Sequence, residues 1–195
     1  AYLSAAPFVL RNVLGMGTVA YTAVFGLCGA TVTVTIAVAA SLVRRFSQAR
    51  QVRVGLIAVL VVDTVFAAVC LIWLREPVTG PERMPLLVAV VALFLAHVAC
   101  LGLSMGNAPA LALDRTGRWA GTGSALLGFL QFVVGGLVSP LVGLTGEASG
   151  VAFGVVIVAV GAIANILAVF GLRERGEKQR LAVQASERRQ RRLGE

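Results

Sequence analysis

The chain has 195 residues, of which 58% are hydrophobic and 13% are charged, and its formal net charge is +8. A soluble domain carries about 45–50% apolar and about 25% charged residues, so this chain lacks the polar surface of a water-soluble globule. Disordered chains are poor in apolar residues, and disorder is therefore excluded as well. Eight basic residues lie after Gly171, apart from the apolar bulk, so the charge does not indicate nucleic-acid binding. The composition predicts an integral membrane protein.

A helix needs about 20 apolar residues to cross a bilayer. Five stretches are long enough, and they cover residues 19–43, 54–74, 85–106, 119–144 and 151–172. A sixth, residues 1–14, is too short and is interpreted as the end of a truncated span, because the chain begins at Ala1 already inside an apolar run. We expect an all-α six-helix bundle over residues 1–172 and a basic cytoplasmic tail over residues 173–195.

One segment argues locally for a strand, because Thr31, Thr33 and Thr35 alternate with apolar residues. It lies within 25 residues that carry no charge, far longer than a barrel strand of about 9–11 residues. An isolated strand cannot satisfy its backbone polar groups in lipid, whereas a helix can. We therefore predict a helix.

The positive-inside rule predicts the orientation. The loop after the second span carries four arginines over residues 44–53, the loop after the fourth carries Arg115 and Arg118, and the tail carries eight basic residues. The loops of the opposite side carry three, two of them offset by neighbouring glutamates. We expect the arginine-rich loops and the C-terminus to face the cytoplasm.

Two ionisable residues lie near the middle of predicted spans. Asp63 would cost about 2.5–3.5 kcal/mol to insert in its ionised form, so it is either a proton-carrying carboxylate or a neutral group bonded to a neighbouring helix. His97 is the single histidine of the chain. It either lines a permeation path and exchanges a proton, or is a neutral imidazole hydrogen-bonded within the bundle.

The fifth span carries small and polar residues on one helical face. The stripe consists of Gly121, Ser124, Gly128, Gln131, Gly135 and Ser139. It favours close helix packing with a hydrogen bond from Gln131, and a substrate-facing groove is the alternative. Pro7 and Pro140 predict helix kinks.

An enzymatic function is not expected. Residues 102–106 match the GxSxG pattern of serine hydrolases, but that motif needs a preceding strand, and here a membrane helix precedes it. The histidine lies seven residues before Ser104, roughly 10 Å along the same helix. Neither a metal site nor a cofactor site is visible in the cysteine and histidine spacing.

Three segments stand out: AYLSAAPFVL (residues 1–10), LVRRF with RVGL (residues 42–46 and 53–56), and GNAPALALDRTGRWAGTGSALLGFLQFVVGGLVSPLVG (residues 106–143). They resemble the Bcr/CflA-type drug-resistance transporters of the major facilitator superfamily. The resemblance implies the C-terminal half of a twelve-helix major facilitator, whose N-terminal six helices are missing from this chain. It also implies a bacterial inner membrane protein that confers antibiotic resistance.

The resemblance implies roles for individual residues. The family's seventh and tenth helices line the central cavity, so Tyr2, Pro7 and His97 become candidates for the substrate cavity, with Gln131 at the interface between halves. Asp63 would lie on a peripheral helix and remains, with His97, a candidate for proton coupling. Arg44 and Arg45 match a basic loop that gates the cytoplasmic side.

The function implied is efflux of small hydrophobic drugs in exchange for protons, by alternating access between two halves. The alternative is a six-helix membrane scaffold or assembly protein that transports nothing.

Overall fold

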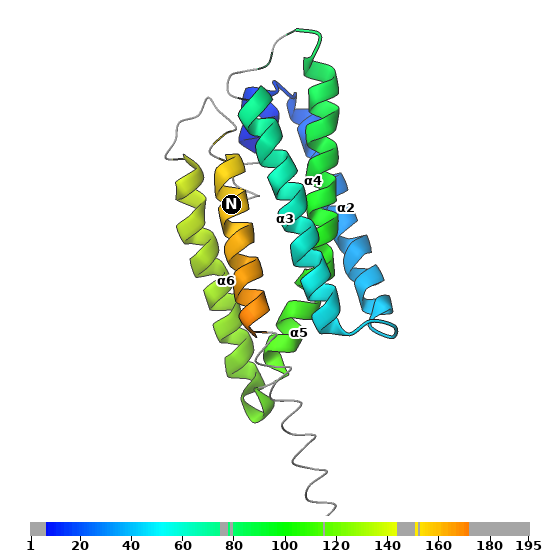
Figure 1. Cartoon of the computed structure of the whole chain (residues 1–195), viewed down its shortest axis with the longest axis vertical. Helices are drawn as coiled ribbons and strands as arrows, with labels where there is room; N and C mark the ends of the chain where they lie inside the picture. Colours follow the sequence, from blue (N-terminus) through cyan, green and yellow to red (C-terminus); the bar gives the residue numbers. More distant parts are fainter. Residues whose placement is uncertain are drawn as a thin grey trace, which may run out of the picture.

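The computed structural model describes residues 7–74, 78, 80–114, 116–143, 151 and 153–171. Tyr2 and the basic tail at residues 173–195 lie outside the described residues. Over the part described, the chain is helical without any strand, and its long helices run roughly side by side (Figure 1).

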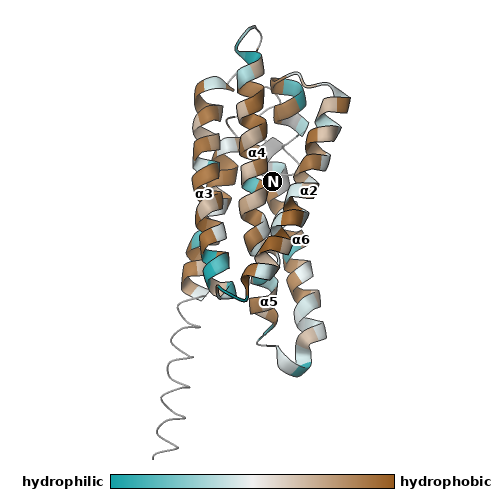
Figure 2. Cartoon of the chain, turned by 90° about the vertical axis from the view of Figure 1, so that its right-hand side faces the viewer, coloured by the Kyte–Doolittle hydropathy of each residue, from teal (hydrophilic) through white to brown (hydrophobic). Residues whose placement is uncertain are grey.

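The elements follow one another as expected for an all-α membrane protein. They are η1 (Phe8–Val13), α2 (Thr18–Leu42), α3 (Gln48–Trp73), α4 (Arg83–Met105), α5 (Asn107–Leu113), η2 (Gly117–Trp119), α6 (Ala120–Gly143) and a last helix, Phe153–Gly171. Within the described ranges, five helices are long and apolar enough to cross a membrane, and apolar residues cover most of their length (Figure 2). The all-α fold class predicted from the sequence is confirmed.

Helix α2 contains the threonines that alternate with apolar residues. The hydroxyls of Thr31, Thr33 and Thr35 donate to the carbonyls four residues earlier, at 2.7–2.9 Å. Each hydroxyl therefore finds its acceptor within the helix, which suits a polar side chain in an apolar environment.

Two helix boundaries differ from those expected from hydropathy. Helix α3 begins at Gln48 instead of residue 54, because the Ser47 side chain accepts a hydrogen bond from the Arg50 amide and caps the helix. After α4 the chain remains helical to Leu113, beyond the expected end at residue 106. Helices α4 and α5 are separate because Pro109 has no amide hydrogen with which to continue the α4 hydrogen-bond ladder.

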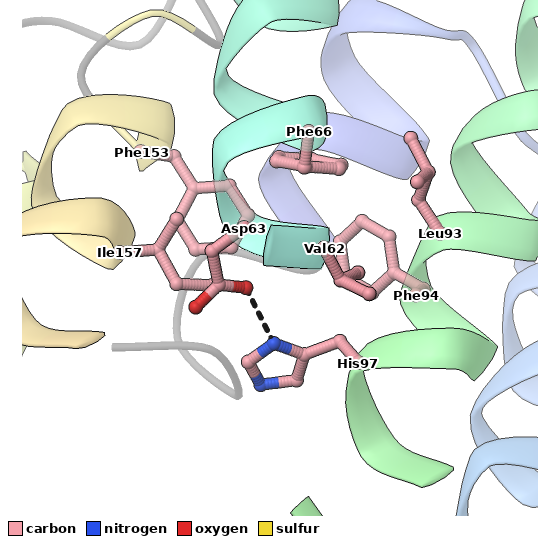
Figure 3. A pocket seen from close by; sticks show the side chains of 8 residues that line it. All are labelled: Val62, Asp63, Phe66, Leu93, Phe94, His97, Phe153 and Ile157. Atoms are coloured by element: carbon pink, nitrogen blue, oxygen red, sulfur yellow. Dashed lines mark hydrogen bonds and ion pairs between the residues drawn. The ribbon is translucent and has the colours of Figure 1, made fainter. Parts of the chain in front are cut away.

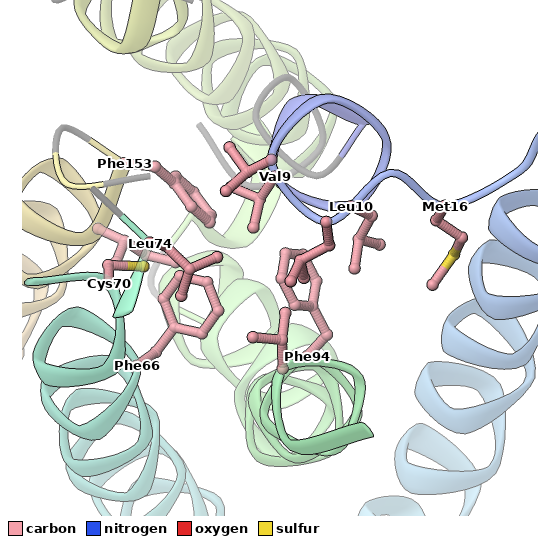
Figure 4. Packing of buried hydrophobic residues seen from close by; sticks show 12 residues of the cluster. Val9, Leu10, Met16, Phe66, Cys70, Leu74, Phe94 and Phe153 are labelled. Carbon is pink, nitrogen blue, oxygen red and sulfur yellow. The ribbon is translucent and has the colours of Figure 1, made fainter. Parts of the chain in front are cut away.

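The first segment is short in the described residues. Pro7 precedes η1, a π-type turn in which the Leu14 amide donates to the Val9 carbonyl at 3.1 Å. Val9, Leu10, Val13 and Leu14 are at most 2% exposed. They pack against buried residues of α3, α4 and the last helix, among them Phe66, Cys70, Phe94 and Phe153 (Figure 4).

Glycines bring the helices of the bundle close together. A Cβ atom at Gly102 of α4 would lie 2.7 Å from Thr35 Cβ of α2, and one at Gly55 of α3 would lie 2.5 Å from Ser104 Oγ of α4. Helix α4 therefore touches α2 and α3 at short range, on different faces.

Helix α6 is packed very differently. None of the residues in its most apolar window is buried, and Phe132 is 85% exposed. A Cβ atom at Gly121, Gly128 or Gly135 would meet nothing within 4 Å. The close helix contact expected along this stripe is therefore not made to any described residue, and Pro140 lies inside the helix.

Candidate functional site

The side chains of Asp63 and His97 meet in the interior of the bundle. Asp63 Oδ1 on α3 lies 2.6 Å from His97 Nδ1 on α4. The two residues are only 2% and 7% exposed, and Figure 3 shows them pointing toward one another from neighbouring helices. The structure therefore joins two residues that the sequence analysis treated separately.

Apolar side chains surround this pair. Val62, Phe66, Leu93, Phe94, Phe153 and Ile157 line a pocket together with Asp63 and His97. The rings of Phe66 and Phe94 meet edge to face with centroids 5.3 Å apart, and Phe66 and Phe153 do so at 5.4 Å. The pair is thus held in a largely hydrocarbon environment (Figure 3).

The pocket is small. Its space is on the order of a single water molecule, whereas sites for drug-sized ligands enclose about 300–1,000 Å³. In this conformation it has room for a proton and its water, and it has no room for a drug molecule.

The chemistry available to the pair is proton exchange. A carboxyl and an imidazole in hydrogen-bond contact can pass a proton from one to the other. A buried charge without a partner is expensive, so the pair is far less costly when it carries one proton between its two groups than when it is a lone carboxylate. The pair can therefore bind and release a proton in response to how much water reaches it.

The other candidate residues lie apart from this pair. Gln131 is exposed on α6, Arg44 and Arg45 are exposed in the turn after α2, and Pro7 precedes η1. Tyr2 lies outside the described residues. Of the sequence-predicted site residues, the described structure thus brings only Asp63 and His97 into contact.

A second polar cluster, which the sequence analysis missed, lies near the arginine-rich end of the bundle, where Arg44, Arg45, Arg50 and Arg53 are found. Asn107 Nδ2 donates to Gln51 Oε1 at 3.1 Å and to the Leu103 carbonyl at 2.9 Å. Gln51 Nε2 donates to the Phe46 carbonyl at 3.2 Å. The cluster connects the start of α3 with the break between α4 and α5. Amides near the ends of apolar spans were the available signal.

Ser104 does not have the surroundings of a hydrolase nucleophile. It is buried within α4, and its hydroxyl donates to the Val52 carbonyl at 3.4 Å. The GxSxG sequence therefore lies in a helix and does not form the strand–turn–helix elbow that the motif requires. Among the described residues, no group of three or more His, Cys, Asp or Glu side chains is placed to hold a metal ion.

The long apolar helices indicate a multi-pass membrane protein. Sequence comparison points to the same class. The chain is 28% identical over 176 residues to an uncharacterized MFS-type transporter, YdgK, of Bacillus subtilis strain 168. The aligned region covers 88% of this chain and 40% of that protein, so the chain spans less than half the length of the relative. No protein-family profile and no solved structure matches the chain.

The long apolar helices of the described residues suit a multi-pass membrane protein, as does the similarity to part of a transporter. The similarity supports a transport function in general.

Proposed function

We propose that this chain is the C-terminal half of a proton-coupled transporter of the major facilitator superfamily, of the Bcr/CflA drug-efflux type. The single observation that carries the proton coupling is the contact of 2.6 Å between Asp63 and His97. The similarity to an MFS-type transporter supports the transport function.

The buried pair is suited to coupling because its proton occupancy and its access to water depend on each other. When the pair holds one proton in common it is neutral overall, and it tolerates the hydrocarbon pocket. When that proton leaves, a net negative charge remains, which favours a conformation that admits water. Proton release on one side of the membrane and binding on the other would then drive the two conformations of an alternating-access cycle.

The substrate is a small hydrophobic, drug-like molecule that binds between this half and an N-terminal six-helix half. Helix α6 supports the presence of such a partner, because its small residues Gly121, Gly128 and Gly135 suit close helix packing and have no described residue against them. Gln131, Pro7 and Tyr2 are the proposed contributors to the cavity wall. His97 is proposed at the edge of that cavity, where proton and substrate occupancy would influence each other.

The proposed location is the bacterial inner membrane, with the C-terminus in the cytoplasm. Arg44 and Arg45 then lie at the cytoplasmic end, exposed in the turn between α2 and α3. We propose that they belong to the gate that closes the inner side.

The test uses the full-length transporter that contains this chain, reconstituted in vesicles with an imposed proton gradient. Export of ethidium, a fluorescent hydrophobic cation, is expected to require the gradient and to stop when a protonophore collapses it. Asp63→Asn is expected to abolish gradient-driven export. Glu82→Gln makes the same chemical change at an exposed position outside the pocket and is expected to retain export.

Export that persists without a gradient would contradict proton coupling. If no hydrophobic compound from a panel of cationic, neutral and anionic probes is transported, the result would favour the alternative role as a membrane scaffold or assembly protein.

A further inference from the structure

The last helix, Phe153–Gly171, packs on α3 through residues that leave little space between the two backbones. A Cβ atom at Gly154 would lie 3.0 Å from the Ala67 Cα atom. Asn165, three turns further along, donates from Nδ2 to the Leu56 carbonyl of α3 at 2.9 Å. The two helices are therefore in close contact over most of their shared length.

Gly161 lies between these two contacts, and it faces Asp63. A Cβ atom at Gly161 would lie 3.3 Å from Asp63 Oδ2, the carboxylate oxygen that does not contact His97 Nδ1, and 3.5 Å from Leu60 Cδ1. A distance of 3.3 Å is tighter than most Cβ contacts, so the carboxylate or the helix would have to shift by a few tenths of an ångström to admit a side chain here.

The carboxyl group of Asp63 is thus confined from two directions. His97 contacts Oδ1 from α4, and the backbone of the last helix at Gly161 lies against Oδ2. Phe153 and Ile157 of the same helix complete the lining of the pocket (Figure 3). The last helix therefore forms one wall of the space around the carboxylate.

We infer that Gly161 is a positioning residue for the proton-binding pair: its missing side chain allows the last helix to close over Asp63 and sets the pH at which the pair exchanges its proton. This inference rests on the proposed function, since it concerns the same pair. Movement of the last helix away from α3 would admit water to Asp63, and its return would exclude it.

Among the residues that the structure describes, few other titratable groups lie near the pair. Helix α3 contributes Cys70, two turns beyond Asp63, and α4 contributes Cys100, one turn beyond His97. Arg50 and Arg53 lie at the arginine-rich end of α3, and Arg83 lies at the start of α4. The described part of the last helix contains no ionisable residue at all. Its influence on the pair must therefore be steric and dielectric.

The test exploits the single histidine of the chain. The 195-residue chain is labelled with ¹⁵N in its histidine, reconstituted in lipid nanodiscs, and followed by ¹⁵N NMR across a pH series. Every imidazole signal then belongs to His97, and the ¹⁵N shifts report its protonation and tautomer directly.

Gly161→Ala is expected to move the midpoint of this titration by about half a pH unit or more. Gly171→Ala is the control, because it adds the same methyl group to the same helix at a position where a Cβ atom would meet nothing within 4 Å. It is expected to leave the midpoint in place. Gly161→Ser is a second variant, which adds a hydroxyl that can donate to Asp63 Oδ2, and it is also expected to move the midpoint.

An unchanged midpoint in both Gly161 variants would overturn the inference, and so would equal shifts in the Gly171 and Gly161 variants. Asp63→Asn separates this failure from failure of the proton-binding pair. If Asp63→Asn leaves the His97 titration unchanged, the pair itself is not the proton site. If it changes the titration while the Gly161 variants do not, only the positioning role is wrong.

Discussion

Asp63 Oδ1 and His97 Nδ1 lie 2.6 Å apart although 34 residues separate them in the chain. Each group lies in an apolar span where an unpaired charge would be costly, and each lowers that cost for the other. The contact joins α3 to α4, the two helices at the centre of the bundle (Figure 1).

The pair should show strong energetic coupling. His97→Gln leaves the Asp63 carboxyl without its imidazole partner, and breaking such a buried pair costs about 3–5 kcal/mol. The double variant Asp63→Asn/His97→Gln is expected to lose clearly less stability than the two single variants combined. Thermal unfolding in detergent micelles measures this. Additivity within about 0.5 kcal/mol would show that the two side chains do not interact.

Close helix contacts should make two glycines sensitive to a single methyl group. Gly102→Ala places a Cβ atom 2.7 Å from Thr35 Cβ, and Gly55→Ala places one 2.5 Å from Ser104 Oγ. Each is expected to destabilise the bundle by about 1–3 kcal/mol through overpacking. Gly29→Ala on α2 meets nothing within 4 Å and is the control, with an unchanged or higher unfolding temperature. Equal behaviour of all three variants would contradict the helix packing described.

Arg83 should hold the segment that follows η1. Its Nε donates to the Leu14 carbonyl at 2.8 Å, and its Nη2 donates to the Gly15 carbonyl. Arg83→Ala is expected to raise hydrogen exchange at the Met16 amide by about tenfold, since a hydrogen bond to a charged group contributes about 1.5–3 kcal/mol when well formed. Arg11→Lys, which alters a single exposed contact of 3.3 Å to Thr18, is the control. Unaltered exchange in the Arg83 variant would show that the hydrogen bonds from Arg83 to Leu14 and Gly15 do not hold this segment in place.

The stability of the cluster formed by Asn107 and Gln51 should depend on the side-chain donor of Asn107. Asn107→Asp keeps the shape of the side chain but places an acceptor opposite Gln51 Oε1 and the Leu103 carbonyl. It is expected to destabilise the chain more than Asn107→Ala, which costs about 1–3 kcal/mol. The unfolding temperatures of the two variants at neutral pH test this order, and the reverse order would mean that the donor role is assigned wrongly.

The helical state of α2 was predicted from the sequence, and two helix boundaries, at Ser47 and before Pro109, could have been. The threonines of α2 form a helix as expected, because only a helix supplies an acceptor to every one of their hydroxyls in an apolar medium. The cap at Ser47 and the break before Pro109 follow from local chemistry, but hydropathy alone set the expected boundaries at residues 54 and 106. Polar residues at span ends escape a search for long apolar runs.

The contact between Asp63 and His97, in contrast, could not be predicted from the sequence. Both residues stood out as ionisable groups near the middle of spans, yet nothing in either span indicates which neighbour its side chain faces. The rotation of α3 against α4 decides that, and it depends on packing at distant positions such as Gly55 and Ser104. The exposed stripe around Gln131 shows the converse, since its small residues predict a close contact that no described residue of this chain provides.

The sequence by itself determined that this protein lies in a membrane and that its spans are helical. Hydropathy and backbone hydrogen bonding are properties of each segment alone, so they can be read one span at a time. Only the tertiary structure decided that Asp63 meets His97 and that Gly161 closes over the carboxylate. Those contacts depend on the rotation and depth of three helices relative to one another, which the packing of many side chains sets together.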